Sequence, residues 1–294
     1  DFLTDYLTDR AIDVIDENKE QPFFLYFAYN TPHTPIQGRK DLVEYFRSKV
    51  KIDAIHTNPI YAAMVASLDQ SVGRIVQRLS EHDLSDNTVL IFLSDNGGLT
   101  QRYGKRDFFT ENLPLRRGKG SAYEGGVRVP WIVKWPGVVP AGRQCEQPVI
   151  STDLYPTILA ITDVEGDAEH NAAVDGVDLS AMFRDPTASV ERNLFWHYPH
   201  YHAGGDGPYS AIRSGDYRLI EFHEDQSVRL FDLSRDIGEK DDLSSKLPGK
   251  TSELRKKLAE WRISTGAQMP TVNPDYDPGR ESEVSKGQKA RKRN

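Results

Sequence analysis

The sequence predicts an α/β fold: a mainly parallel sheet flanked by helices, followed by a small antiparallel sheet with a terminal helix. Two observations carry this prediction. Up to about residue 160, apolar runs typical of buried strands alternate with amphipathic helical patterns. After residue 186, short runs rich in aromatic and β-branched residues are separated by turns, which is typical of an antiparallel sheet.

The chain opens on a helical pattern, because apolar residues such as Leu3 and Ala11 fall on one face. The continuous apolar run 23–28 follows, and we expect it to form a strand buried on both faces. A longer helix is predicted to begin at Asn58, a favoured N-cap, with Pro59 in its first turn.

Two further strands are predicted at 88–93 and 129–135, and a further helix at 153–161. Asp153 is expected at the N-terminus of that helix, where a carboxylate interacts favourably with the helix dipole. The polar, glycine-rich stretch 97–128 is too long for an ordinary connection and is predicted to be functional.

The C-terminal part is predicted to contain four antiparallel strands, at 192–197, 209–213, 217–222 and 228–232, and a last helix carrying Leu254, Leu258 and Trp261. We expect one unit over 1–185 and a small antiparallel-sheet subdomain with its terminal helix over 186–270. The segment 271–294 is rich in charge, proline and glycine and ends in a basic cluster, so disorder is expected there.

Composition limits the possible functions. The net charge of -7 argues against a nucleic-acid-binding protein, whose surface would be basic. No apolar run approaches transmembrane length. Cys145 is the single cysteine, so an internal disulfide is excluded. The chain begins at Asp1 without an initiator methionine, and we expect that the natural N-terminus lies upstream.

Polar side chains follow two of the predicted strands. His33 lies after the run 23–28, and Asp95 and Asn96 lie after 88–93. Open α/β sheets bind ligands beyond the carboxyl ends of their strands. Together with a cationic, glycine-rich stretch around Lys119, these residues would supply hard oxygen ligands, an imidazole and fixed positive charge around one cleft.

Several motifs occur in one order along the chain: His33-Thr34-Pro35, Ser94-Asp95-Asn96-Gly97, Arg117-Gly118-Lys119, Tyr123-Glu124-Gly125-Gly126-Val127-Arg128 and Ser151-Thr152-Asp153-Leu154-Tyr155-Pro156-Thr157. The set resembles the C-terminal part of the formylglycine-dependent sulfatases, arylsulfatase-like members of the alkaline-phosphatase-like superfamily. The resemblance runs from residue 1 to about residue 265. It implies that 1–185 is the C-terminal part of a sulfatase catalytic domain.

The resemblance assigns roles to four of these residues. Asp95 and Asn96 would be calcium ligands, because calcium takes carboxylate and amide oxygens; the alternative is an ordinary Asp-Asn-Gly turn. Lys119 would contact the sulfate ester and its bridging oxygen, where negative charge develops as the S–O bond breaks. His33 would bind the same oxygens or protonate the leaving group. Glu124 is expected to pair with Arg128 in a structural role.

Four residues are candidates for substrate binding. Arg117 would touch an anionic substrate, or it is an ordinary surface arginine. Trp196, His197 and His200 belong to an aromatic and histidine cluster, with Tyr201 and His202, in the predicted small sheet. They would stack on a sugar, or they pack at a strand edge; the sequence leaves both alternatives open.

The family's nucleophile is a formylglycine made from the cysteine or serine of a Cys-x-Pro-x-Arg motif, and this sequence contains no such motif. We therefore expect it upstream of this chain, and expect the fragment alone to be inactive on sulfated glycans or aryl sulfates. Two alternatives remain: a sulfated-glycan-binding pseudoenzyme, and a phosphoesterase of the same superfamily. The family also implies a periplasmic or secreted location.

Overall fold

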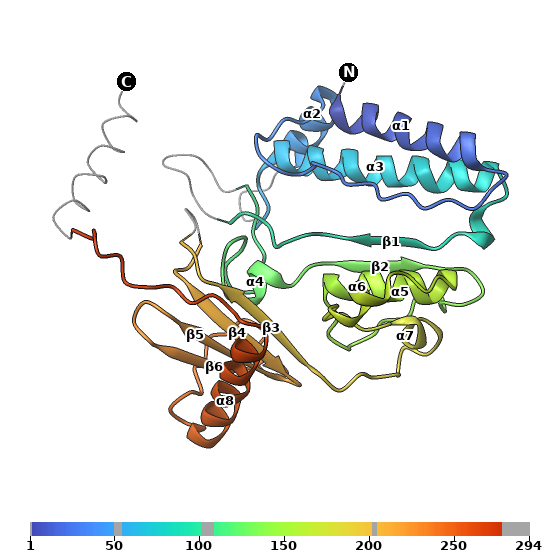
Figure 1. Cartoon of the computed structure of the whole chain (residues 1–294). Helices are drawn as coiled ribbons and strands as arrows, with labels where there is room; N and C mark the ends of the chain where they lie inside the picture. Colours follow the sequence, from blue (N-terminus) through green and yellow to red (C-terminus); the bar gives the residue numbers. More distant parts are fainter. Residues whose placement is uncertain (1, 50–54, 101–108, 202–204, 278–294) are drawn as a thin grey trace.

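The computed structural model describes residues 2–49, 55–100, 109–201 and 205–277 (Figure 1). Its helices and strands are α1 Leu3–Asn18, α2 Lys40–Lys49, α3 Pro59–Glu81, β1 Leu90–Leu93, α4 Glu124–Val127, β2 Trp131–Lys134, α5 Leu154–Thr162, α6 Ala168–Ala172, α7 Ser180–Arg184, β3 Asn193–Tyr198, β4 Tyr209–Ser214, β5 Tyr217–Phe222, β6 Val228–Asp232 and α8 Pro248–Ser264. Within these ranges, every helix is too short or too polar to cross a membrane.

Helices α1, α2 and α3 form a helical layer on one side of β1 (Figure 1). Ala11 and Ile15 of α1 are buried against Ile75 and Leu79 of α3, which is the apolar face that the helical pattern predicts. The start of α3 is confirmed, because the Asn58 side chain accepts hydrogen bonds from two backbone N–H groups of the first turn, each at 3.1 Å.

A chain of buried hydroxyl groups joins the helical layer to the extended segment after α1. The Thr8 Oγ1 lies 2.5 Å from the Ser71 Oγ, and the Tyr29 hydroxyl lies 2.6 Å from the same Ser71 oxygen. Thr4 and Thr31 make a second hydroxyl pair at 2.6 Å. These bonds are neutral, and they fix residues 29 and 31 to α1 and α3.

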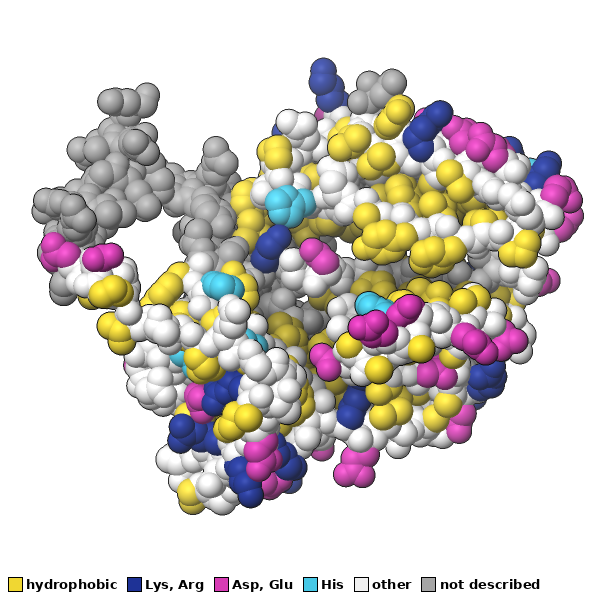
Figure 2. Space-filling model, viewed as in Figure 1, with side chains coloured by type: hydrophobic (Ala, Val, Ile, Leu, Met, Phe, Trp, Pro, Cys, Tyr) yellow, Lys and Arg dark blue, Asp and Glu magenta, His cyan; other side chains and the backbone are white. Residues whose placement is uncertain are grey.

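The prediction of a strand buried on both faces over 23–28 is wrong for the described residues. The segment is extended but is not assigned as a strand. Phe23 and Leu25 pack on the helical layer, whereas Phe24 and Tyr26 are 72% and 80% exposed. Figure 2 shows apolar side chains gathered on the face formed by this layer. Alternate residues of an extended chain point to opposite sides, so only one side is covered here.

Strands β1 and β2 confirm the runs predicted at 88–93 and 129–135, but they pair antiparallel, with Leu90 opposite Lys134 and Leu93 opposite Trp131. All pairs among the described strands are antiparallel, so the expectation of a mainly parallel sheet is not met there. The segment between β1 and β2 returns the chain to the end of the sheet where β1 finishes. A parallel neighbour would require a crossover to the opposite end.

The four predicted C-terminal strands are confirmed as an antiparallel sheet of order β3-β4-β5-β6, the C-terminal sheet. One face packs on α8, through Ile212, Leu219, Leu230, Leu254 and Leu258. The opposite face packs on the stretch before α4, through Ala122, Tyr123, Ala211, Ile220 and Phe231. The sheet therefore lies between its own helix and part of the motif-bearing segment.

The division at residue 185 stays a prediction, although β3 is the first strand of the C-terminal sheet. The expected disorder of 271–294 falls mostly on 278–294, which lies outside the described residues. The helix predicted at 153–161 is confirmed as α5. Asp153 immediately precedes it, is buried, and makes an ion pair with Arg192.

Candidate functional site

The loop 94–98, the Asp95 loop, begins where β1 ends. The Asp95 side chain is exposed, and its Oδ1 accepts a hydrogen bond from the Asn96 backbone N–H at 2.9 Å. The Asn96 Nδ2 donates to the Gly97 carbonyl oxygen at 3.0 Å. Because its amide nitrogen is engaged locally, the Asn96 side-chain oxygen is the atom of this amide that could coordinate a cation.

The segment 116–126, the Lys119 segment, is hydrogen-bonded to the Asp95 loop through the backbone. The Gly97 N–H donates to the Gly126 carbonyl, and the Lys119 N–H donates to the Gly98 carbonyl, both at 3.0 Å. Two motifs that are separated by more than twenty residues in the sequence are therefore adjacent in space. This places the backbone of Lys119 beside the proposed calcium ligands.

Glycine is required where these two segments touch. A Cβ atom on Gly97 would lie 1.8 Å from the Gly125 carbonyl oxygen, and a Cβ on Gly118 would lie 2.2 Å from the Gly98 oxygen. Both distances are far below van der Waals contact, and both neighbours are backbone atoms that cannot rotate away. The glycines of the motifs therefore allow the two backbones to approach closely.

Asn112 joins the same two segments and was missed by the sequence analysis. Its Nδ2 lies 3.0 Å from the Gly98 carbonyl oxygen, and 3.1 Å from the carbonyl oxygens of both Arg117 and Gly125. One amide group thus contacts three backbone oxygens across the junction. Its only local signal is an asparagine shortly before a proline, which is common turn chemistry.

His33 is exposed in the loop that follows the extended segment 23–28. Its Nδ1 lies 2.7 Å from the Thr34 carbonyl oxygen. Because a carbonyl oxygen only accepts, Nδ1 carries the proton, and a neutral ring presents Nε2 as an acceptor. The contacts of His33 within the described ranges are local, so its meeting with Lys119 stays a prediction.

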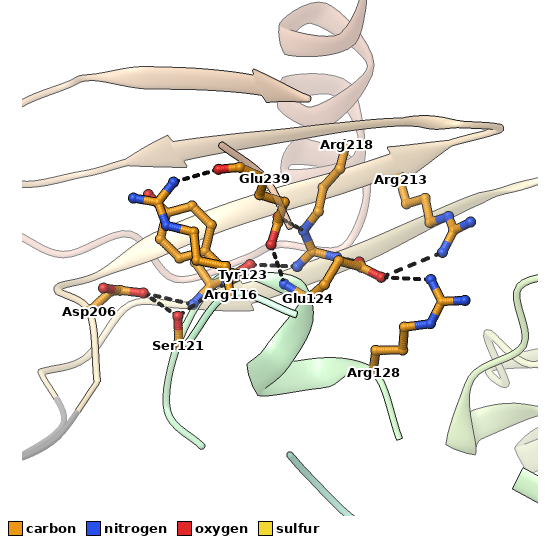
Figure 3. A network of polar contacts seen from close by, with 10 residues as sticks. Arg116, Ser121, Tyr123, Glu124, Arg128, Asp206, Arg213, Arg218 and Glu239 are labelled. Carbon is orange, nitrogen blue, oxygen red and sulfur yellow. Dashed lines mark hydrogen bonds and ion pairs between the residues drawn. The ribbon is translucent and has the colours of Figure 1, made fainter. Parts of the chain in front are cut away.

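A buried ionic network lies beneath the Lys119 segment (Figure 3). Arg218 of β5 is fully buried; its guanidinium donates to the Glu124 carboxylate at 2.9 Å and to the Ala122 carbonyl at 2.6 Å. The predicted pair of Glu124 with Arg128 is confirmed at 3.3 Å. The C-terminal sheet thus supplies the main partner of the motif glutamate, from a position 94 residues later in the chain.

Glu239, in the turn after β6, completes this network and is also fully buried. Its Oε2 accepts from the Glu124 backbone N–H at 2.7 Å, and its backbone oxygen accepts from the Arg116 guanidinium at 2.7 Å (Figure 3). Its Oε1 has no hydrogen-bond partner and lies 3.6 Å from the Arg218 Nε. Burial raises the pKa of the Glu239 carboxyl to about 7.

Asp206 holds the middle of the Lys119 segment. Its carboxylate accepts from the Ser121 hydroxyl at 2.6 Å and from the Ala122 N–H at 3.0 Å, and its own N–H donates to the Gly120 carbonyl at 3.2 Å (Figure 3). Three acidic or basic residues of the C-terminal region, Asp206, Arg218 and Glu239, therefore contact this one segment. The sequence analysis assigned none of them.

The contacts of two predicted substrate residues favour the packing alternative. The Trp196 ring packs against the Arg218 guanidinium, whose Cζ is 4.6 Å from the ring centroid. Both ring nitrogens of His197 are engaged, by the Ser210 hydroxyl and by the Gln268 carbonyl, each at 2.8 Å. These contacts lie within the protein, and a role of the two residues in binding a sugar stays a prediction.

The other substrate candidates keep that role as a prediction. His200 is exposed and lies edge-on to Tyr198, while His202 lies outside the described residues. Arg117 is exposed and lines an open groove between the stretch 113–117 and the turn 238–240. Lys240 lines the same groove, so cationic side chains occur close to the Lys119 segment.

The side-chain oxygens of Asp95 and Asn96 are of the type that coordinates calcium, but they are too few for a complete site. A carboxylate and an amide oxygen are hard ligands, but calcium takes six to eight oxygen donors. In the part of the chain that the structure describes, no group of three or more histidine, cysteine, aspartate or glutamate side chains is arranged to hold a metal ion. Asp95 and Asn96 therefore fit part of a calcium site, which needs further oxygen ligands.

Comparison with known proteins gives two family matches. Residues 2–164 match the Sulfatase family, and residues 118–264 match the family described as N-sulphoglucosamine sulphohydrolase, C-terminal. The chain is 35% identical over 288 residues to a sulfatase of Formosa agariphila, covering 90% of this chain and 51% of that protein. It is 27% identical over 322 residues to arylsulfatase J of Mus musculus, covering 94% and 51%.

Among solved structures, the chain resembles Ps i-CgsB in complex with k-i-k-neocarrahexaose. The TM-score is 0.74 at 32% identity, covering 88% of this chain and 55% of that one. The chain thus spans about half the length of the curated relatives that it matches.

Proposed function

Because this chain belongs to the sulfatase family, whose model matches residues 2–164, we propose that it is part of a sulfuric ester hydrolase. The observation that carries the proposal is the backbone junction between the Asp95 loop and the Lys119 segment. It joins the backbone of Lys119 to the loop that carries Asp95 and Asn96. A cation near hard oxygen ligands suits an anionic ester whose leaving oxygen gains charge.

In this proposal each residue of the chain has a defined task. Lys119 binds the sulfate oxygens and stabilises the charge that develops on the bridging oxygen as the S–O bond breaks. His33, with Nε2 as its acceptor when neutral, binds the sulfate group or, when protonated, donates a proton to the leaving oxygen. Arg117 contributes positive charge in the neighbouring groove.

The nucleophile is proposed to be a formylglycine outside this chain, which supplies the attack on sulfur. Calcium is proposed as the cofactor; Asp95 and Asn96 would hold it in part, and it would supply positive charge for an anionic substrate. Metal content measured by mass spectrometry tests this assignment. The natural protein is expected to bind calcium, and Asp95→Ala to lose it. Stoichiometric zinc in the natural protein would favour the phosphoesterase alternative.

A sulfated carbohydrate is the proposed substrate. The support comes from the similar structure bound to neocarrahexaose and from the cationic side chains Arg117 and Lys240 in the groove. An exported location, periplasmic or secreted, is proposed with it, since polymeric glycans are met outside the cell. The fragment alone is proposed to lack turnover.

The test is sulfate release by the natural protein, measured by ion chromatography with 4-methylumbelliferyl sulfate and with sulfated carrageenan oligosaccharides. Lys119→Ala is expected to lower kcat by about 10²–10³, the effect of removing one group that stabilises transition-state charge. Lys256→Ala, on the exposed face of α8, is the matched control and should leave kcat unchanged. Binding of the oligosaccharide without sulfate release would support a pseudoenzyme instead.

A further inference from the structure

The strongest unassigned feature is the position of Glu239 relative to the Lys119 segment. This residue contacts both ends of the stretch 116–124, in the middle of which Lys119 lies. Its backbone oxygen accepts from the Arg116 guanidinium and its carboxylate accepts from the Glu124 N–H, each at 2.7 Å. A single residue of the C-terminal region therefore fixes the span of the segment.

The surroundings of Glu239 make these bonds strong. The side chain is fully buried, and a buried carboxylate bonded to an N–H is a charge-assisted contact in a low-dielectric site. The Arg116 guanidinium is held on its other side by the Tyr123 ring, with Cζ 3.9 Å from the ring centroid (Figure 3). The two anchor points therefore have little freedom to move independently of the turn after β6.

We propose that Glu239 is a positioning residue for Lys119, which clamps both ends of the stretch 116–124 against the C-terminal sheet; this rests on the catalytic role of Lys119 in the proposed function. Glu239 does not touch the substrate. It acts by keeping the backbone of the stretch 116–124 closed, so that the lysine stays beside the Asp95 loop. Asp206 fixes the middle of the stretch but makes no contact with its two ends.

The first measurement is independent of activity. Hydrogen exchange of the Glu124 amide is followed at single-residue resolution in the natural protein. Glu239→Met removes the carboxylate that accepts from the Glu124 N–H, at similar side-chain volume, and keeps the backbone oxygen that binds Arg116. We expect exchange of the Glu124 amide to accelerate at least tenfold. Glu239→Gln keeps a side-chain oxygen for the same N–H and should stay within threefold of wild type. Glu260→Gln, on the exposed face of α8, is the control for the loss of one carboxylate and should change nothing.

The second measurement is the pH profile of kcat for an aryl sulfate. The Glu239 carboxylate is faced by Arg218, Glu124 and Arg116, and burial raises its pKa to about 7. Ionisation changes the charge of the group that accepts from the Glu124 N–H, so wild type should show an inflection in kcat near pH 7. Glu239→Gln should lose this inflection and keep KM within threefold, because the substrate contacts are intact.

The outcomes separate the two proposals. Unchanged exchange of the Glu124 amide in Glu239→Met, or an unchanged pH profile in Glu239→Gln, would overturn the clamp even in an active sulfatase. Accelerated exchange in a protein without sulfate turnover would support the clamp as a structural device and remove the proposed function. If Glu239→Met does not fold, the Glu239→Gln profile still decides the clamp.

Discussion

The helical layer and the junction between the Lys119 segment and the C-terminal sheet bury their polar groups in different ways. In the helical layer, buried side chains such as Thr8 and Ser71 pair through neutral hydroxyls. At the junction, Glu124, Arg218 and Glu239 are buried with ionisable groups in contact. A buried pair of neutral hydroxyls changes the free energy of folding only slightly, whereas a buried ion destabilises the folded state unless it is paired.

The difference has a consequence for specificity. A buried ion pair is satisfied in only one arrangement of its partners, while hydroxyls accept several. The ionic junction lies under the segment that carries Lys119, so the buried ion pairs favour one position of this segment on the C-terminal sheet. The helical layer, where Phe24 and Tyr26 are exposed on the same side of the extended segment, is defined mainly by apolar packing.

The largest expected effect comes from breaking the ionic pairs. Arg218→Met leaves the buried Glu239 carboxyl without its ion-pair partner and removes the main partner of Glu124, so we expect the free energy of unfolding to fall by about 3–5 kcal/mol. Thr8→Val, the matched change in the helical layer, removes one neutral hydroxyl and should cost about 1 kcal/mol. Urea unfolding of the natural protein and both variants measures the two values. Equal costs would show that the two regions do not differ as described.

The junction was the part of the site least accessible from the sequence. The motifs indicated the Asp95 loop, Lys119 and the pair of Glu124 with Arg128, which the structure contains. Arg218 and Glu239 contact Glu124 across 94 and 115 residues of sequence, and nothing in their local sequence signals this. Charged residues are usually exposed, so composition favoured the surface for both.

In the fold, too, features set by local sequence were predicted correctly, and features set by contacts between distant segments were not. The Asn58 cap and the strands of the C-terminal sheet were predicted correctly, because caps, turns and short alternating runs are local signals. The strand at 23–28 and the parallel pairing were not, because both depend on which neighbours cover a run. Apolar residues alone do not show whether one or both sides of an extended segment are covered.

The second prediction uses pH, since the junction contains a buried carboxyl, that of Glu239, with a pKa raised to about 7. Unfolded Glu239 ionises near its ordinary value of 4.5, so between these values the folded state holds the extra proton. Its stabilising contribution is complete below pH 4.5 and is lost as pH rises through 7, in total about 3 kcal/mol at 1.36 kcal/mol per unit.

Glu239→Gln removes this titration. The difference in unfolding free energy between wild type and variant should therefore change by up to about 3 kcal/mol from pH 5 to pH 8. Wild type should become less stable relative to the variant at the higher pH. Urea midpoints at the two pH values measure it. Thr8→Val removes no titratable group, so its difference from wild type in unfolding free energy should be the same at both pH values. A constant difference for Glu239→Gln would contradict a buried, titrating carboxyl.

The smallest effects come from glycines, one in each region. Gly97→Ala places a Cβ 1.8 Å from the Gly125 carbonyl oxygen at the junction, so we expect a loss of about 1–3 kcal/mol from overpacking. Gly73→Ala in α3 meets nothing within 4 Å and should gain about 0.5–1 kcal/mol, because alanine loses less backbone entropy in a helix. Thermal unfolding of both variants gives the signs. A tolerated Gly97→Ala would mean that the Asp95 loop and the Lys119 segment separate without cost, and the close backbone contact would then not define the site.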